Sequence, residues 1–279
     1  MLADGRSSQQ HAMHRALATP VRRRPPLPLR RLPVIPGYRL HRILGRGSTA
    51  AVYLATRGEL PVALKLVSRP EARLRLRAEV EVLQRLRHPQ IVALHDAGAH
   101  GAYEYAALEL VPGGDLRRRA RGVEQSAEFS AKLVSALATA LQTVHDAGLV
   151  HRDVTPANVL LTTEGAPKIA DFGGTGTPDY LAPEQTVPDG VVGPAADVYA
   201  LGVLLYELLT GRGPFRGSSF ATLIDQIRHA PAVPPARLRP SIPRALDAIT
   251  STCLEKDPRR RFPSAAALAD ALAPLGSPR

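Results

Sequence analysis

Lys65 and Glu79 are oppositely charged residues that the sequence places in apolar surroundings. Lys65 lies in the segment VALKLV, where the neighbouring side chains are apolar. Glu79 lies in the predicted helix that follows, on the face that Leu76 and Leu83 make apolar. A buried carboxylate is costly unless it is paired, so we expect an ion pair between Lys65 and Glu79. The alternative for Lys65 is a lysine that points outward from its strand.

Glu81 is a second carboxylate of this predicted helix, and its spacing indicates a different role. Arg77 and Arg85 stand four residues before and after it. Helix side chains four residues apart meet on the helix surface. We therefore expect Glu81 to form solvent-exposed ion pairs with these arginines, which leaves Glu79 as the partner of Lys65.

A glycine-rich turn precedes both residues. Residues 45–52 read GRGSTAAV, with Gly45 and Gly47 between two predicted strands. Because glycine has no Cβ, such a turn lets backbone amides approach phosphate groups closely. The pattern is weak alone, and it gains weight only from the motifs that come after it in the chain.

Two later motifs combine acidic and amide side chains in a fixed order. Residues 151–153 read His-Arg-Asp, Asn158 follows five residues after Asp153, and Asp171 opens an Asp-Phe-Gly triplet after the next predicted strand. A chance match to this whole set is very improbable. Together with the glycine-rich turn and Lys65, these motifs resemble those of the protein kinases.

The resemblance runs from about residue 38 to residue 272 and implies a fold. The expected class is α+β, with two lobes. A small antiparallel sheet with one helix would form the N-lobe at 37–110. A larger, mainly helical C-lobe would occupy 111–275. Residues 1–36 are rich in Pro and Arg without an apolar period, and a disordered basic tail is expected there.

The resemblance also implies a role for each charged site residue. Asp153 would accept the proton of a substrate hydroxyl and orient that hydroxyl for in-line attack. Asn158 and Asp171 would hold Mg²⁺ or Mn²⁺ against the phosphates of ATP. The Lys65–Glu79 pair would hold the α- and β-phosphates.

The nucleotide pocket is implied by the same resemblance. The segment YAALELVPGGDL resembles the hinge between lobes, with Leu108 behind the adenine and Asp115 near the ribose or a basic substrate residue. The backbone of Glu109 and Val111 would hydrogen-bond the base. The residues implied to bind the nucleotide are Leu44, Gly45, Gly47, Val52, Ala63, Lys65, Glu109, Val111 and Leu160.

Thr155 and Ala50 are two departures from the family pattern. Thr155 stands two residues after Asp153, where Ser/Thr kinases carry a lysine that steadies the γ-phosphate. The loss of that charged contact is worth about 1.5–3 kcal/mol, although the threonine hydroxyl can still act at this place. Ala50 replaces the third glycine of the turn, which is a mild change.

The segment between Gly173 and Ala182 is a larger departure. It contains only eight residues, 174–181, which extend about 30 Å at most. This length joins the two motifs but leaves no arm for regulatory phosphorylation. We therefore expect no on/off control by this route, with Thr175 as the only nearby candidate site. A thinner platform for peptides would also lower substrate affinity.

Further residues of the C-lobe match the family. Thr177 would meet Asp153, and Asp197 would brace the catalytic loop by accepting its backbone amides. Glu184 and Arg261 would form a buried ion pair. Arg152, which normally grips a loop phosphate, would have no anion to grip. The residues placed where the family stacks its regulatory spine are Leu83, Leu94, His151 and Phe172.

Periodicity and turn residues predict the elements that carry these side chains. Ser68 is expected to cap the helix of Glu79, Pro70 to stand in its first turn, and Glu71 to complete a capping box. This helix should end near Arg87, ahead of Pro89. The predicted strands are 38–47, 50–57, 60–67, 90–98 and 103–111, and further helices are expected from 129 to 144, ended by Gly148, and at 195–210.

Composition excludes several classes of protein. The formal net charge is +11, but residues 1–33 hold seven Arg and one Asp. This tail is expected to be a solvated segment, with a docking arm for an acidic partner or membrane and a transit peptide as alternatives. The single cysteine, Cys253, excludes an internal disulfide. No stretch suits a membrane span, and a cytoplasmic protein is expected. Nucleic-acid binding would rest only on the Arg-rich tail and is not expected.

The sequence therefore predicts a bacterial-type serine/threonine protein kinase that uses Mg-ATP on protein substrates, with self-phosphorylation as one such reaction. The alternative is a pseudokinase, a nucleotide-binding interaction module with little or no phosphotransfer. Thr155 and the short segment support that alternative. A small-molecule kinase of similar fold is disfavoured, because GTPDYLAPEQ and DVYALGVLLYELLTG indicate a platform for protein substrates.

Overall fold

The computed structural model describes residues 32–47, 50–120, 122–174 and 176–276. The chain divides into two units, Met1–Val34 and Ile35–Arg279. The predicted tail falls almost wholly outside the described residues, as do Thr175 and two residues of the glycine-rich turn, Ser48 and Thr49. The described helices and strands all belong to the second unit.

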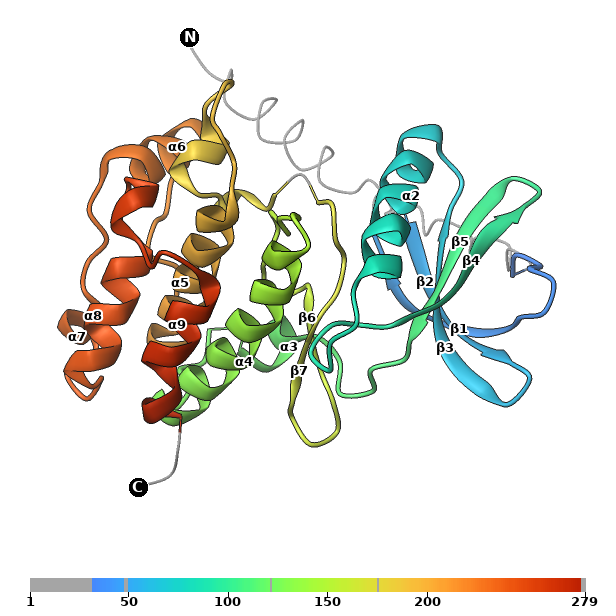
Figure 1. Ribbon diagram of the computed structural model, residues 1–279, viewed down its shortest axis with the longest axis horizontal. Helices are drawn as coiled ribbons and strands as arrows, with labels where there is room; N and C mark the ends of the chain where they lie inside the picture. The colour runs from blue at the N-terminus through green and yellow to red at the C-terminus, as the bar shows by residue number, and fades with distance from the viewer. Residues whose placement is uncertain (1–31, 48–49, 121, 175, 277–279) are drawn as a thin grey trace, which may run out of the picture. The chain divides into compact units, whose positions relative to one another are not determined.

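A five-stranded antiparallel sheet forms the first lobe of this unit (Figure 1), as predicted. Alternate residues of its third strand, Val62, Leu64 and Leu66, are buried on one face and pack with Ile35 and Tyr53. Ile35 is thus part of this core, slightly ahead of the expected boundary at residue 37. The strands, in sheet order, are β1 (Arg39–Arg46), β2 (Ala50–Arg57), β3 (Leu60–Val67), β5 (Tyr103–Glu109) and β4 (Leu94–His100).

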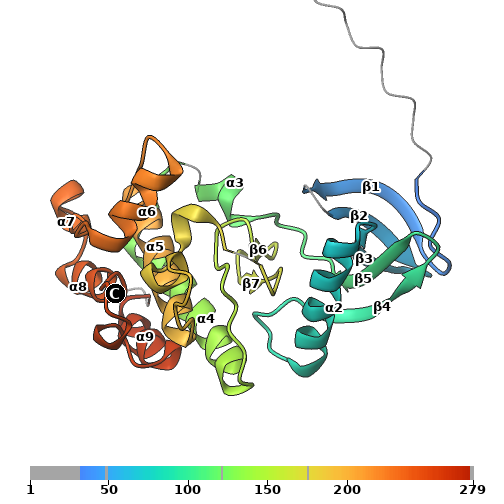
Figure 2. The same ribbon diagram turned by 90° about the horizontal axis from the view of Figure 1, so that it is seen from above.

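Helix α2 (Pro70–Arg85) lies against this sheet (Figure 2) and buries Leu76, Glu79 and Leu83, as its pattern predicts. Its predicted start is wrong. Arg69 occupies the N-cap, and no side chain makes a capping hydrogen bond. The helix begins one residue too late for Ser68 to act as the cap, so Glu71 does not occupy the third helical position that a capping box requires.

The second lobe is mainly helical, and its small sheet lies next to the first lobe (Figure 1). Strands β6 (Val159–Leu161) and β7 (Pro167–Ile169) form this antiparallel pair. Its helices are α3 (Leu116–Ala120), α4 (Ala127–Asp146), α5 (Pro194–Thr210), α6 (Phe220–His229), α7 (Pro235–Leu238), α8 (Arg244–Cys253) and α9 (Ala265–Leu272). Short 3₁₀ turns lie at η1 (Pro178–Tyr180), η2 (Pro183–Thr186), η3 (Pro258–Arg260) and η4 (Ala273–Leu275).

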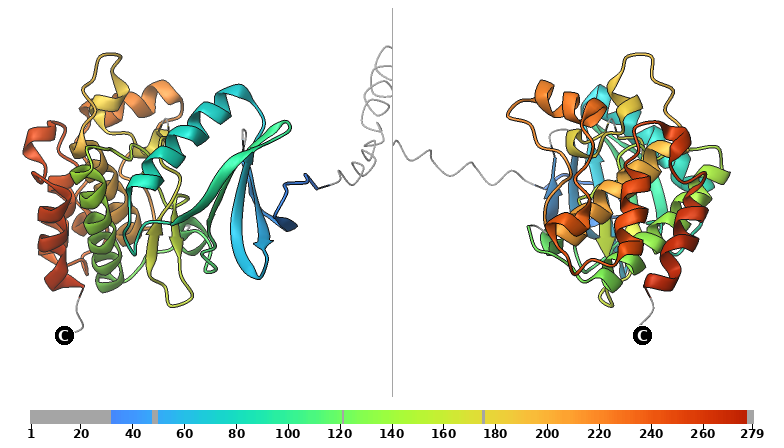
Figure 3. Two further views of the ribbon diagram at one scale, coloured as in Figure 1. Left: turned by 45° about the vertical axis from the view of Figure 1, so that its right-hand side comes forward. Right: turned by 90° about the vertical axis from the view of Figure 1, so that its left-hand side faces the viewer.

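Helices α4 and α5 form the centre of this lobe (Figure 3), and α4 contacts both α5 and α9. The Ser126 side chain accepts a hydrogen bond from the amide of Phe129, which caps the start of α4. Gly148 lies just beyond its last turn with φ +74°, a left-handed conformation that favours glycine. Nearly every residue of α5 is buried, including Asp197, as the continuous apolar pattern predicts.

Among the described residues, no helix combines the length and the apolar character that crossing a membrane requires.

Candidate active site

A cleft of about 750 Å³ lies where the two lobes of this unit meet. Residues from β1, β2, β3 and α2 line it on one side, and residues from the hinge, the loop before β6 and the segment after β7 line it on the other. The cleft is lined by every residue that the sequence assigns to the nucleotide pocket, namely Leu44, Gly45, Gly47, Val52, Ala63, Lys65, Glu109, Val111 and Leu160.

Lys65 is hydrogen-bonded to two carboxylates of the cleft. Its Nζ lies 2.6 Å from Oε2 of Glu79 and also donates to Oδ1 of Asp171. Glu79 is only 2% exposed, so the ammonium group offsets the cost of burying that carboxylate. Burial acts to lower the pKa of Lys65, but the carboxylates of Glu79 and Asp171 prevail and raise it. The predicted pairing of Lys65 with Glu79 is confirmed.

Glu81 does not form the pairs that its spacing predicts. Arg77 instead forms an ion pair with Glu104 on β5, and Arg85 donates to the carbonyl of Ala147. Glu81 is exposed on α2. Tertiary partners outcompete the local pairs, because an exposed pair on one helix contributes only about 0.3–0.5 kcal/mol.

Asp153 lies in the loop before β6, and each of its carboxylate oxygens accepts a hydrogen bond. The Thr177 hydroxyl donates to Oδ1 at 2.8 Å, and Nδ2 of Asn158 donates to Oδ2 at 3.1 Å. Asn158 also donates to the backbone carbonyl of Asp153 at 2.9 Å. These bonds orient the carboxylate within the cleft, where it can accept a proton.

Asn158 and Asp171 are the oxygen donors available to a hard cation. Both line the cleft, and the Asp171 side chain is 52% exposed. Asp171 has φ +65°, which is uncommon for a residue other than glycine. No group of three or more His, Cys, Asp or Glu in the described ranges could hold a metal ion. The side chains of Asn158 and Asp171 together fit Mg²⁺, which uses one or two carboxylates and takes its other ligands from water and phosphate.

Asp197 holds the loop that carries Asp153. Its fully buried carboxylate accepts from the amides of His151 at 2.9 Å and Arg152 at 2.8 Å, as predicted. It also lies 2.8 Å from Nε2 of His145, a contact that the sequence did not predict. Arg152 has φ +70°, so these bonds fix a backbone turn that an arginine rarely adopts.

Gly174 shows how closely the short segment passes the candidate base. A Cβ atom at this position would lie 2.7 Å from Oδ2 and 2.8 Å from Cβ of Asp153. Only a residue without a side chain fits this path. The sequence predicts the short segment but gives no signal that its backbone lies against Asp153.

The remaining C-lobe predictions concern a buried ion pair, the regulatory spine and Arg152. Arg261 donates to both carboxylate oxygens of Glu184, at 2.7 and 2.8 Å, which confirms the predicted buried pair. The rings of His151 and Phe172 lie 4.6 Å apart, and Leu83 and Leu94 belong to the same core. Arg152 has no ion pair within the part of the chain that the structure describes.

Thr155 is the predicted site residue that the structure keeps out of the cleft. It is 3% exposed and is not among the residues that line the cavity. Its backbone carbonyl accepts from the amide of Asn158 at 3.0 Å, which is a turn contact. The side chain of Thr155 is therefore nearly buried at the position where the family pattern has a lysine.

Glu109 and Lys168 form a contact in the hinge region that the sequence did not predict. Nζ of Lys168 on β7 lies 2.9 Å from Oε1 of Glu109, and the amide of Ala93 donates to Oε2 at 3.2 Å. This ties the hinge to the strand that precedes Asp171. The two residues are 59 positions apart, so no local pattern could have indicated their pairing.

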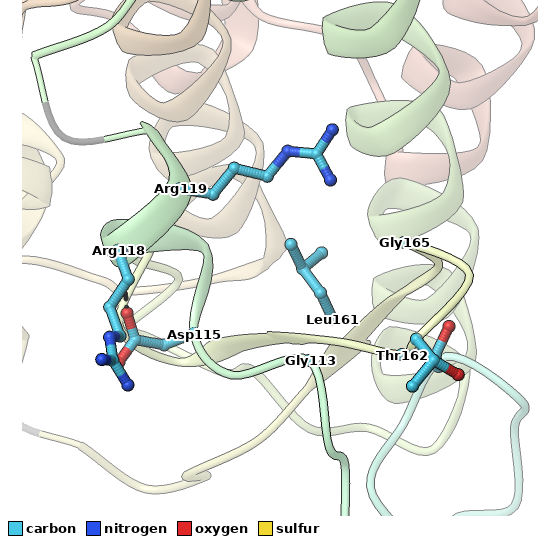
Figure 4. A pocket seen from close by; sticks show the side chains of 8 residues that line it. Gly113, Asp115, Arg118, Arg119, Leu161, Thr162 and Gly165 are labelled. Atoms are coloured by element: carbon cyan, nitrogen blue, oxygen red, sulfur yellow. Dashed lines mark hydrogen bonds between the residues drawn. The ribbon is translucent and has the colours of Figure 1, made fainter.

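A second hollow of about 470 Å³ lies beside α3, at the turn between β6 and β7 (Figure 4). Asp115 accepts from the amide of Arg118 at 2.9 Å. The side chain of Arg118 lies next to Asp115, whereas that of Arg119 points away from it (Figure 4) and lies over the ring of Phe129. Asp115 and Arg118 line both cavities, so this hollow adjoins the rim of the cleft.

Known proteins resemble this chain over most of its length. The family described as "Protein kinase domain" matches residues 38–272. Serine/threonine-protein kinase PknH of Mycobacterium tuberculosis is 35% identical over 255 residues, which cover 83% of this chain and 41% of PknH.

Two further relatives are equally similar. Serine/threonine-protein kinase PksC of Streptomyces coelicolor is 34% identical over 268 residues, 84% of this chain and 48% of PksC. Serine/threonine-protein kinase PknD of M. tuberculosis is 36% identical over 256 residues, 83% of this chain and 38% of PknD. The chain thus spans less than half the length of the curated relatives it matches.

Proposed function

The chain belongs to the protein kinase domain family, and on that premise we propose that it transfers the γ-phosphoryl group of Mg-ATP to Ser or Thr hydroxyls of proteins. The observation that carries the proposal is the convergence of Lys65, Asp153, Asn158 and Asp171 in one cleft. These side chains come from distant parts of the chain. Phosphoryl transfer needs this set, because its catalysis consists of positioning and of stabilising charge.

In the proposed reaction, Lys65 binds the α- and β-phosphates while Glu79 fixes its position. Asn158 and Asp171 would hold Mg²⁺, which would supply neutralisation of charge on the phosphate oxygens. Asp153 orients the substrate hydroxyl and accepts its proton. The hydroxyl oxygen forms a bond to the γ-phosphorus as the bond from that phosphorus to the oxygen of ADP breaks.

The contact of the Thr177 hydroxyl with Asp153 resembles the contact that a substrate hydroxyl would make. This hydroxyl donates to Oδ1 of Asp153 at 2.8 Å, the kind of contact that a substrate Ser or Thr would make. Protein substrates, including other copies of this chain, are the proposed acceptors.

A pseudokinase is the second candidate, and the position of Thr155 favours it. Thr155 is nearly buried and does not line the cleft, so this position offers no cation to the γ-phosphate. The chain would then bind nucleotide and regulate a partner without transferring phosphate.

A phosphotransfer assay separates the two candidates. It uses labelled ATP, Mg²⁺ or Mn²⁺, and a generic basic protein as acceptor. Asp153→Asn should lower transfer to Ser and Thr by about 10²- to 10⁴-fold, because the proton acceptor is lost. Asp189→Asn is the control, since Asp189 is exposed and lies outside the cleft. Saturable ATP binding without transfer would support the pseudokinase instead.

A further inference from the structure

Helix α2 carries Glu79, so its position decides whether Glu79 reaches Lys65. The apolar face of α2 packs on the sheet, but apolar packing is non-directional and permits the helix to slide or rotate. Three arginines of α2, Arg73, Arg77 and Arg85, reach partners outside the helix. Unlike the apolar packing, these hydrogen bonds are directional.

Arg77 is the one of these three arginines whose partner in these bonds is a carboxylate. Its Nε lies 3.0 Å from Oε2 of Glu104, and its Nη2 donates to Oε1 of the same carboxylate. A two-bond fork of this kind fixes direction as well as distance. The Glu104 side chain, on β5, is only 8% exposed. The hydrogen bonds from Arg77 lower the pKa of Glu104, so the partner stays ionised at neutral pH.

Arg73 and Arg85 add a contact at each end of the helix. Nη2 of Arg73 donates to the carbonyl of Ala102, between β4 and β5, at 2.6 Å. Nη2 of Arg85 donates to the carbonyl of Ala147, just after α4, at 2.7 Å. The first half of α2 is thus held to the β4–β5 hairpin and its last turn to the second lobe.

None of these three contacts uses a residue of the short segment 174–181. We propose that Arg77, supported by Arg73 and Arg85, is a positioning residue that holds α2 where Glu79 pairs with Lys65. The pair then forms through the fold itself, without a contribution from modification of the short segment. This inference rests on the proposed function for its catalytic consequence, but the position of the helix can be measured separately.

A double-mutant cycle tests the catalytic consequence. Arg77→Met and Glu104→Gln should each lower kcat/KM for ATP by about tenfold, and Arg77→Lys should recover part of the loss, because lysine keeps the charge but not the fork. In a Glu79→Gln background, Arg77→Met should change kcat/KM by less than about twofold, since the pair is already broken. An equal loss in both backgrounds would mean a general structural role and would overturn the proposal.

Hydrogen exchange of the α2 amides supplies the readout that does not need activity. Arg77→Met should speed exchange across the helix by about tenfold or more, whereas Glu81→Gln, an exposed change on the same helix, should leave it unaltered. Unchanged exchange rates of the α2 amides in Arg77→Met would overturn the proposal that Arg77 holds α2. If wild-type protein transfers no phosphate, the proposed function fails, and the exchange result still decides whether Arg77 holds α2.

Discussion

At the scale of single residues, the environment of Asp153 decides what the cleft can do. Both of its carboxylate oxygens accept a hydrogen bond, from Thr177 and Asn158, and the backbone of Gly174 lies against it. The candidate base is therefore held by the short segment as well as by its own loop. A small change in the structure of that segment should therefore displace the carboxylate of Asp153.

Gly174→Ala tests this contact. The added Cβ would lie 2.7 Å from Oδ2 of Asp153, so the aspartate or the segment beside it must shift. A misplacement of about 1 Å can cost 10²-fold in rate, and we expect kcat to fall by at least about tenfold while nucleotide affinity is kept. Steady-state kinetics and an ATP titration measure the two quantities.

Gly193→Ala is the matched control for this substitution. Gly193 has no atom within 4 Å of its would-be Cβ, and its φ of −121° suits any residue. Its replacement should leave kcat unchanged. Full activity of Gly174→Ala would show that the contact with Asp153 has no catalytic weight.

At the scale of elements, α5 supports the catalytic loop through Asp197. This carboxylate is fully buried and holds the amides of His151 and Arg152 together with the ring of His145. Asp197 is thus a charged group near the start of a largely apolar helix, and backbone amides of the loop between α4 and β6 donate to it. Burial without these donors would be strongly unfavourable.

Asp197→Ala should destabilise the protein as well as the loop. Each buried donor left without a partner costs about 1–3 kcal/mol, so we expect the free energy of unfolding to fall by at least about 2 kcal/mol. Urea titration followed by circular dichroism measures it. Asp225→Ala, on the exposed surface of α6, is the control, and an equal effect of both changes would contradict the role of Asp197.

Elements also explain which helix predictions failed. The apolar face of α2 was predictable from periodicity, because Leu76, Glu79 and Leu83 follow helical spacing. The N-cap of α2 was not predictable, since Ser68 and Arg69 both stand close before Pro70. Which of them caps the helix depends on the tertiary path of the chain. The ion pair of Arg77 and the hydrogen bond of Arg85 were also missed, because their partners lie on β5 and after α4.

At the scale of the whole molecule, the two lobes are linked by contacts that avoid the short segment. Lys168 ties β7 to the hinge through Glu109, and Arg85 ties α2 to the second lobe. Lys65 joins Glu79 of one lobe to Asp171 of the other. The cleft is thus assembled by charged contacts distributed over both lobes.

Activity should therefore be independent of phosphorylation in residues 174–181. We expect phosphatase-treated protein and Thr175→Ala each to keep kcat within about twofold of untreated protein, because no switch of charge is needed to order the site. Mass spectrometry verifies that the treated protein carries no phosphate. A mock-treated sample is the control, and loss of activity on dephosphorylation, restored by rephosphorylation, would refute the prediction.

The sequence by itself determined the order of motifs, the fold class and the members of the cleft. Spacing alone led to the pairing of Lys65 with Glu79, since a carboxylate on an apolar helix face needs a cation. The roles of Asp153, Asn158 and Asp171, the fold class and the residues of the cleft followed from the resemblance of the motifs to those of the protein kinases. Motifs and local period are properties that a chain carries without folding.

The tertiary structure alone decided which distant groups meet. It placed Thr155 outside the cleft, Gly174 against Asp153, and Arg77 on Glu104 rather than on Glu81. Each outcome depends on the path of a segment that is remote in sequence. Local patterns measure neither that path nor the burial that makes one ion pair prevail over another.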